Sequence, residues 1–297
     1  MSHEAFRALL APEDRARLAE RSDAAGLRHL ALHWGLIGAF GTLIALRVPG
    51  WPLLMVPQGL LLAFLFTLQH ECTHATPFAS GRLSTWVGRI AGLPILQPFE
   101  WFRLFHLAHH RHTNDPARDP ELAGGKPRTW AHYALHVSGW TFWAGHVRTL
   151  AASALARVGA PYIPERAHPR LVREARVMLA VYAGAALCTL LVSPVLLRVW
   201  LIPVLIAMPA LRLYVLAEHG RCPHVADLFE NTRTTLTSRA VRWLAWNMPY
   251  HAEHHAYPDV PFHRLPELHA MARPHLGVVG EGYGAVTADY ARGLHRA

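Results

Sequence analysis

Three clusters of histidine have the spacing of metal ligands. They are His70-Glu-Cys-Thr-His74, His106-Leu-Ala-His109-His110 and His251-Ala-Glu-His254-His255. On a helix, residues at i, i+3 and i+4 share one face, so each cluster is expected to present its imidazoles together. A further histidine, His219, lies at the end of an apolar run in the stretch Ala-Glu-His-Gly.

Nine candidate nitrogen ligands are too many for one metal ion, because a zinc ion takes about three or four protein ligands. Two metals with four or five ligands each would use all nine. Imidazole suits iron, although zinc and copper also accept it. The predicted ligands are His70, His74, His106, His109, His110, His219, His251, His254 and His255.

The other histidines do not share this spacing. The chain holds 22 histidines against 20 acidic residues, and a solitary histidine is usually a surface residue or a satisfied core residue. His112 lies two residues beyond the second cluster and leaves its face, so it is the alternative ligand. His263 and His269 flank the third cluster and are expected to support it or to lie at the surface.

Carboxylates near the clusters are candidates for orienting the imidazoles, because a ligating histidine usually donates its second N–H to such a group. Two of them also precede proline, in Asp115-Pro116 and Asp119-Pro120, and this predicts helix termination and a turn equally well. The candidates are Glu71, Asp115, Asp119, Glu218, Glu253 and Asp259.

Four apolar runs could position the clusters. Apolar residues make up 52% of the 297 residues, and the mean hydropathy is +0.14. The runs cover about 30–46, 51–68, 177–197 and 199–216, near the length that crosses a bilayer. They predict an all-α integral membrane protein with two transmembrane hairpins. Residues 83–99 and 133–158 are amphipathic and are expected to lie in the interface, since Arg89 and Pro94 disfavour a further span.

The basic residues predict the orientation. The N-terminal, middle and C-terminal segments carry 5, 13 and 8 of them, whereas the loops between paired runs carry only Arg47 and Arg198. Basic segments stay in the cytoplasm during insertion, so the histidines should face the cytoplasm, most simply of a bacterial inner membrane. This distribution accounts for the net charge of +9 without nucleic acid. Arg212 lies inside the fourth run. No cleavable signal peptide is expected, because no short apolar stretch follows the start methionine.

The three clusters together resemble those of the membrane fatty acid desaturase family. The likeness rests on HECTH at 70–74, HLAHHRHTNDPARDPEL at 106–122 and HAEHHAYPDVPFHRLPELH at 251–269. It implies a single domain over 1–297, with a core of about 30–270, cytoplasmic tails at 1–29 and 271–297, and a cytoplasmic helical cap holding a di-metal site. It also implies that the nine histidines bind two irons, with O2 as co-substrate.

The resemblance further implies electrons from a separate carrier of ferredoxin, rubredoxin or cytochrome b5 type. The spacing of the first cluster looks more like that of acyl-lipid than of acyl-CoA desaturases. The stretches AEHG and HAEHHAYPDVPFHRLPELH look most like a bacterial branch that includes dihydrorhizobitoxine desaturase.

The expected activity is O2-dependent oxidation of an unactivated C–H bond in a lipid-like substrate, most simply desaturation to an alkene. A hydroxylase, a carotenoid ketolase or hydroxylase, and a decarboxylase that forms terminal alkenes remain alternatives on the same scaffold. The first cluster also matches the HExxH motif of zinc proteases, with Glu71 as general base. That function would leave two HxxHH clusters unexplained. A metal transporter would need ionisable groups within the spans, which contain almost none.

Overall fold

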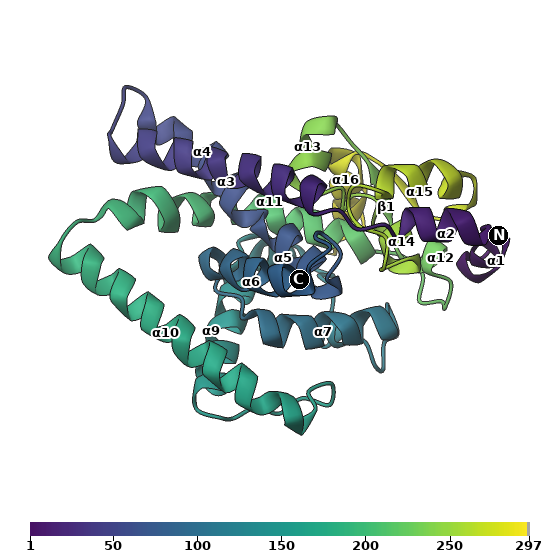
Figure 1. Cartoon of the computed structure of the whole chain (residues 1–297), viewed down its shortest axis with the longest axis horizontal. Coiled ribbons are helices and arrows are strands. Elements are labelled where there is room, and N and C mark those ends of the chain that lie inside the picture. Colours follow the sequence, from purple (N-terminus) through teal and green to yellow (C-terminus); the bar gives the residue numbers. More distant parts are fainter. Residues whose placement is uncertain (296–297) are drawn as a thin grey trace.

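The computed structural model describes residues 1–295, and helices account for most of them (Figure 1). The longer helices of the first two thirds of the chain are α3 (Asp23–Ala45), α4 (Trp51–Ala63), α5 (Leu65–His74), α6 (Gly81–Gly92), α7 (Phe99–Arg111), α8 (Trp130–Val137), α9 (Trp140–Ala154), α10 (His168–Leu191) and α11 (Ile202–His219).

Shorter elements make up the two ends of the chain and the connections. They are α1 (His3–Leu9), α2 (Pro12–Leu18), α12 (Leu228–Asn231), α13 (Arg239–Leu244), α14 (His251–Ala256), α15 (Leu265–Ala272), α16 (Tyr283–Arg292), the 3-10 turns Leu93–Ile95, Pro120–Leu122, Glu165–Ala167 and Arg273–His275, the π-helical turn Leu197–Leu201, and the strands β1 (Thr234–Leu236) and β2 (Val279–Glu281).

Three helical segments are long and apolar enough to cross a membrane, by length and composition. They are Trp51–His74, which joins α4 and α5, Glu165–Leu191, and Leu197–His219. The first predicted run also forms a long helix, α3, but α3 is not among the three. Its first half carries Arg28, His29 and His33, which lower its hydropathy.

The first predicted hairpin is present as a pair of packed helices. Gly50 adopts a left-handed conformation, with φ of 80°, between α3 and α4, and Pro52 lies in the first turn of α4. Glycine tolerates that φ because it has no Cβ, and proline is favoured where its missing N–H needs no partner. α4 then packs against both α3 and α11.

The two helices of the second predicted hairpin do not pack side by side. Helix α10 diverges from α11 instead of running alongside it (Figure 1). Leu150 of α9 packs with Ala175 and Met178 of α10, and Tyr182 of α10 donates a hydrogen bond of 2.9 Å to the carbonyl of Leu93. These contacts hold α10 against α9 and the segment after α6. An apolar cavity of about 520 Å³ therefore separates its C-terminal half from α3 and α4.

The amphipathic stretch at 83–99 does not form a span, as predicted. Helix α6 has 12 residues, which is too short to cross the hydrocarbon core. Leu96 then adopts a left-handed conformation with φ of 55°, and α7 begins after Pro98. This break turns the chain so that α7 carries the second histidine cluster back to α5.

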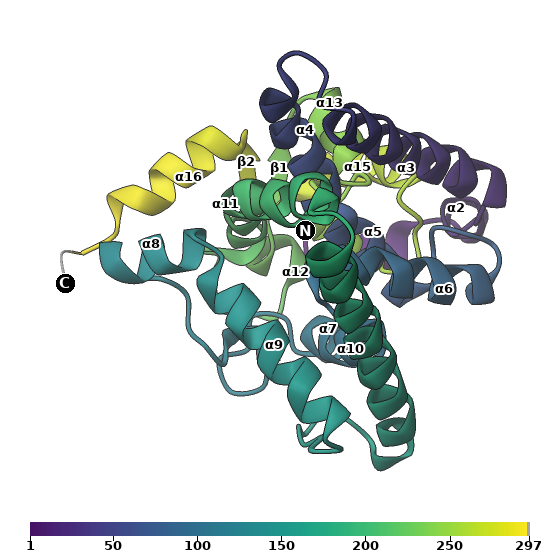
Figure 2. The same cartoon turned by 90° about the vertical axis from the view of Figure 1, so that its left-hand side faces the viewer.

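The N-terminal helices and the segment after α11 lie together beside the apolar helices and form a cap, toward the right of Figure 1; Figure 2 shows the molecule from the side of the apolar helices. The expectation of an all-α fold is wrong in one detail, because β1 and β2 pair in parallel. Residues 1–29 are not a loose extension: Phe6 of α1 packs against Phe229 and Tyr257.

Candidate metal centre

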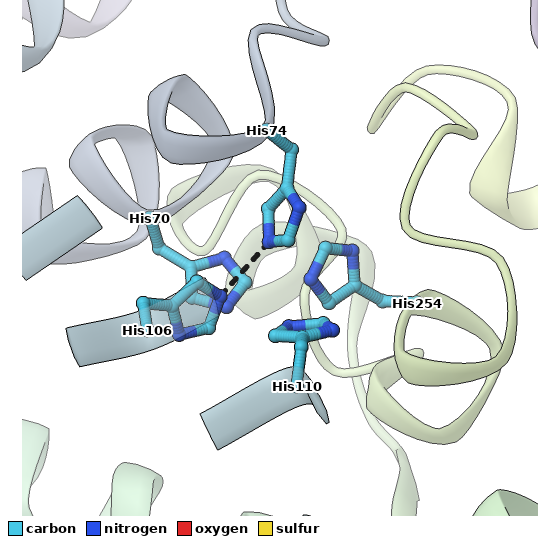
Figure 3. Close-up of side chains that lie close together, drawn as sticks. All are labelled: His70, His74, His106, His110 and His254. Atoms are coloured by element: carbon cyan, nitrogen blue, oxygen red, sulfur yellow. Dashed lines mark hydrogen bonds between the residues drawn. The ribbon is translucent and has the colours of Figure 1, made fainter. Parts of the chain in front are cut away.

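Five histidines from three helices converge in one group. The first cluster lies at the end of α5, the second on α7 and the third on α14. Their ligand atoms all lie within 4.8 Å of one another, and Nε2 of His74 lies 2.9 Å from Nε2 of His106. Figure 3 shows the five rings pointing toward a common space. The group consists of His70, His74, His106, His110 and His254.

The remaining four candidate ligands form a second group. Nε2 of His219 lies 3.2 Å from Nε2 of His109 and 3.2 Å from Nε2 of His251. Nε2 of His255 lies 3.1 Å from that of His251. All four are buried. The nine predicted residues therefore meet as five and four, which is the division that two metals would need.

Each HxxHH cluster contributes to both groups, so presenting its imidazoles together on one face of a helix does not assign them to one metal. On α7, His106 and His110 belong to the five-histidine group and His109 to the four-histidine group. On α14, His254 joins the five, and His255 joins the four. Adjacent residues on a helix point about 100° apart, since 3.6 residues make a turn. Adjacent histidines can thus serve two metals.

The four-histidine group is oriented by partners on Nδ1. Nδ1–H of His109 donates to Oδ1 of Asp119 at 2.9 Å, and Asp119 also accepts the backbone N–H groups of Asn114 and Glu121. Nδ1 of His255 lies 3.1 Å from the hydroxyl of Thr113. These bonds place the proton on Nδ1 and leave Nε2 free for a metal.

The other two members have longer contacts on Nδ1. Nδ1 of His219 lies 3.4 Å from the carbonyl oxygen of Asn231. Nδ1 of His251 lies 3.4 Å from a carboxylate oxygen of Glu218. Glu218 directly precedes His219 at the end of α11, so one turn of this helix contributes one imidazole and supports another.

Sequence reasoning missed Glu121. Its Oε2 lies 3.5 Å from Nε2 of His109, on the side where a metal would be held, and its other oxygen accepts a hydrogen bond from Lys126. Burial would raise the pKa of Glu121, but Lys126 and His109 outweigh it and hold that pKa well below the ordinary value. No spacing rule identifies this residue, because a proline-bounded turn separates it from the second cluster.

The other predicted carboxylates have different roles. Glu71 accepts hydrogen bonds from the Thr76 hydroxyl and the Phe262 N–H, at 3.0 and 3.1 Å. Glu253 binds the side chains of Thr234 and His269. Glu71 joins α5 to the cap and also lies near a predicted ligand, because its Oε1 is 3.9 Å from Nδ1 of His254. Glu253 joins separate elements of the cap, and the expectation that it orients a predicted ligand is wrong.

The remaining two lie at the surface. Asp115 caps a turn and binds Arg118 at 2.7 Å, and Asp259 is exposed. Asp115 thus has only the turn-forming role, whereas Asp119 both forms a turn and orients His109.

Burial sets the charge of the rings. It lowers the pKa of His106, His110 and His254 well below the ordinary value, and the neighbouring imidazoles lower it further. Burial acts in the same direction on His109, but Glu121 and Asp119 outweigh it and raise the pKa of that ring. Neutral imidazoles keep the lone pairs that a metal needs.

The residues fit a metal centre. Both ring nitrogens of His70, His110 and His254 are buried without a hydrogen-bond partner among the described residues. A buried polar atom without a partner is costly, and a metal ion would satisfy these nitrogens. His112, the alternative ligand, ends α7 and belongs to neither group.

The zinc-protease alternative has no support in this geometry. His70 and His74 share their group with three further histidines, which leaves no open coordination position of the kind that a catalytic zinc keeps. Glu71 is fully buried, its Oε2 accepts hydrogen bonds from Thr76 and Phe262, and its Oε1 lies 3.9 Å from Nδ1 of His254.

A small cavity of about 160 Å³ adjoins both histidine groups. Two members of each group line it, together with Glu121 and Glu218. Its walls are mostly aromatic, and one cation, Arg212, also lines it. The full set of wall residues includes Phe66, Trp101, Phe102, Phe105, Phe142 and His146.

The family model described as "Fatty acid desaturase" matches residues 15–287. The chain belongs to the fatty acid desaturase family. Members of this family among the curated proteins are desaturases, which are oxidoreductases. The family resemblance that the three clusters indicated is therefore confirmed. The closer likeness to the dihydrorhizobitoxine desaturase branch stays a prediction.

Individual desaturases are distant relatives. The sn-1 acyl-lipid omega-3 desaturase (ferredoxin) of Synechocystis sp. is 33% identical over 99 residues, 32% of this chain and 27% of that protein. The sphingolipid delta(4)-desaturase/C4-monooxygenase DES2 of Homo sapiens is 25% identical over 215 residues, 68% of this chain and 59% of that protein. The matches thus span less than two thirds of each of these relatives.

Proposed function

We propose that the nine histidines hold two irons and that the enzyme uses O2 to desaturate an unactivated C–C bond of a lipid-like substrate. The observation that carries this proposal is the division of nine buried imidazoles into groups of five and four. The chemistry supplied by two bound irons would be the activation of O2 and the removal of hydrogen atoms from carbon, which acid–base side chains cannot achieve.

The protein would orient the metal ligands and would exclude water from the reaction site. Asp119 and Thr113 fix two rings of the four-histidine group, and the aromatic walls of the adjoining cavity exclude water from the reacting carbon. Whether a second hydrogen is lost or a hydroxyl group is added depends on small differences in substrate position. Hydroxylation is the second candidate, because the human relative is named as both a desaturase and a monooxygenase.

Metal content and product identity test this proposal. Protein purified without added zinc should contain about two irons per chain. Expression in membranes with an electron donor should yield an alkene that mass spectrometry detects among lipids and hydrophobic metabolites. A single tightly bound zinc, or a fully loaded protein whose only products are alcohols, would contradict the di-iron or the desaturase part, respectively.

We further propose that α3 is a fourth transmembrane helix. Its 23 residues could cross the bilayer, and it exposes Leu27, Leu32 and Leu43, which water would not favour. α3 also packs along α4, whose continuation as Trp51–His74 is apolar enough to span. The proposed topology has both histidine groups and both termini in the cytoplasm.

Cysteine labelling tests the topology. In a Cys188→Ser background, which removes the exposed native thiol, a cysteine at Gly50 should react only from the periplasmic side of a bacterial inner membrane. A cysteine at Gly124 should react only from the cytoplasm. A cysteine at Glu13, before α3, should also react only from the cytoplasm. All three positions are exposed, so labelling of Glu13 and Gly50 from the same side would contradict a span at α3.

An acidic electron carrier, most simply of ferredoxin type, would fit the polar face beside His219. A cavity of about 610 Å³ there is lined by His219 and by the basic side chains of Lys126, Arg128 and Arg221. Electrostatic complementarity mainly raises the rate of association. Arg128→Glu should therefore slow turnover with a ferredoxin donor at low salt but not reduction by dithionite. Arg157→Glu, exposed at the end of α9, is the control.

A further inference from the structure

Arg212 is a cation inside a membrane-spanning helix. It lies in α11, within the span Leu197–His219, seven residues before His219. Seven residues correspond to about 10 Å along a helix axis, so its backbone is two turns from the four-histidine group. Charged residues at such depth are costly and usually face a cavity with a role in function.

The guanidinium group of Arg212 forms no salt bridge among the described residues, although the charge of Glu121 acts on it. No carboxylate oxygen within residues 1–295 lies within 4.0 Å of it, and its Nε is buried without a hydrogen-bond partner among them. Its nearest partners are the ring of Phe142, 5.6 Å from Cζ, and Nε2 of His136, 3.1 Å from Nη2. Burial and Arg212 itself lower the pKa of His136 to about 3, so this ring is neutral.

The two carboxylates of the same cavity are engaged at its metal end. Glu121 binds Lys126 and lies 3.5 Å from His109. Glu218 lies 3.4 Å from His251. Arg212 lines the cavity from farther along α11. The cavity therefore holds one cation that forms no salt bridge among the described residues and that faces the space in which a substrate would lie.

We propose that Arg212 binds a carboxylate group of the substrate and that the carbon to be oxidised lies only a short distance from that acid group. This inference rests on the proposed function. Arginine is suited to a carboxylate because its planar fork donates two parallel hydrogen bonds. The cavity volume of about 160 Å³ is below the roughly 300–1,000 Å³ of typical small-molecule sites. The substrate is thus a compact amphiphilic acid, with no long acyl chain between Arg212 and the metals.

Equilibrium binding to the metal-loaded enzyme in lipid nanodiscs tests this inference, with radiolabelled octanoate and octan-1-ol as probes. Octanoate should bind at least about 30-fold more tightly than the alcohol, and Arg212→Gln should weaken octanoate binding by at least about 30-fold, because breaking a buried charged pair is costly. Arg212→Lys should recover part of the loss. Arg198→Gln is the matched control, since Arg198 lies at the other end of the span, 5.9 Å over Trp51.

Equal binding of acid and alcohol to the unaltered enzyme would overturn the inference, as would octanoate binding that survives Arg212→Gln. The comparison of octanoate with octan-1-ol on the unaltered enzyme needs no variant. It therefore still tests the inference if Arg212→Gln fails to fold. Iron measured in the same samples separates the two proposals. Two irons without a preference for the acid would refute the role of Arg212 alone, whereas a preference for the acid in a protein that takes up no iron would refute the proposed function alone.

Discussion

The two histidine groups are built differently. In the four-histidine group, every Nδ1 has a carboxylate, hydroxyl or carbonyl oxygen within 3.4 Å. In the five-histidine group, His70, His110 and His254 have no hydrogen-bond partner on either ring nitrogen among the described residues, and the rings are held by packing against one another. Three rings of the four-histidine group are held by hydrogen bonds on Nδ1, and His251 has only the longer contact with Glu218. The five-histidine group depends mainly on helix geometry and ring contacts, with Glu71 3.9 Å from Nδ1 of His254.

This difference has a physical consequence for each group. Hydrogen bonds fix the tautomer and raise the basicity of a ligating ring, so the four-histidine group should depend on single polar neighbours. The five-histidine group buries neutral rings without partners, which is unfavourable until a metal binds. We expect the five-histidine group to destabilise the metal-free protein. We expect the four-histidine group to be sensitive to substitution of single neighbouring residues.

The largest expected effect is on the stability of the metal-free protein. Burial lowers the pKa of His106, His110 and His254 in the folded state, so the unfolded chain binds more protons below about pH 6.5. Stability should therefore fall as pH falls from about 7.5 to 5, by up to about 1.4 kcal/mol per pH unit for each proton taken up. Thermal unfolding of chelator-treated protein measures this slope.

His254→Leu should reduce that slope, because it removes one of the buried rings. His112→Ala should leave it unchanged, since His112 lies outside both groups. A metal-free protein with a flat profile between pH 7.5 and 5 would show that the rings are not held neutral by burial.

Loss of a ligand from the smaller group should come next. His219→Ala leaves three imidazoles in the four-histidine group; turnover should fall by at least about 100-fold, and metal content should fall from two toward one per chain. His74→Ala leaves four in the other group, and metal content should stay near two. Atomic emission analysis of the purified proteins measures both.

His224→Ala is the control for His219→Ala. Nδ1 of His224 lies 2.9 Å from the backbone oxygen of Asn114, and His224 belongs to neither histidine group. If His219→Ala kept two metals and normal turnover, the division into five and four would not describe the working centre.

Asp119→Asn should have an intermediate effect. It removes the charge that holds Nδ1–H of His109, and changes of this kind typically cost about 10–100-fold in metal affinity or activity. Asp115→Asn is the control for an effect on the turn alone. Asp115 binds only the exposed Arg118 side chain and local backbone, and it contacts no imidazole of either group. Similar losses in the two variants would attribute the effect to the turn.

Thr113→Val should have the smallest effect. The Thr113 hydroxyl supports Nδ1 of His255 at 3.1 Å, and a neutral hydrogen bond of this kind contributes about 0.5–1.5 kcal/mol, or roughly 2–12-fold in metal affinity. Competition with a chelator measures it. Thr189→Val, whose hydroxyl bonds only within α10, should show no change.

Much of the metal centre could be predicted from sequence. All nine histidines proposed from their spacing are brought together, including His219, which stands outside any cluster. Helical periodicity carries this information, because residues at i, i+3 and i+4 share a face whatever the helix packs against. The apolar runs predicted at 51–68 and 199–216 lie within Trp51–His74 and Leu197–His219, whereas the run predicted at 177–197 overlaps only the second half of Glu165–Leu191.

The sequence by itself determined the ligand types, their helices and the apolar segments that carry them, because these depend on local periodicity and hydropathy. Only the tertiary structure decided which histidines share a group, that Glu121 rather than Glu253 lies beside them, and that α10 diverges from α11. It also decided that Arg212 faces the cavity at the centre. These features depend on contacts between residues far apart in the chain, and no local pattern specifies which helix faces meet.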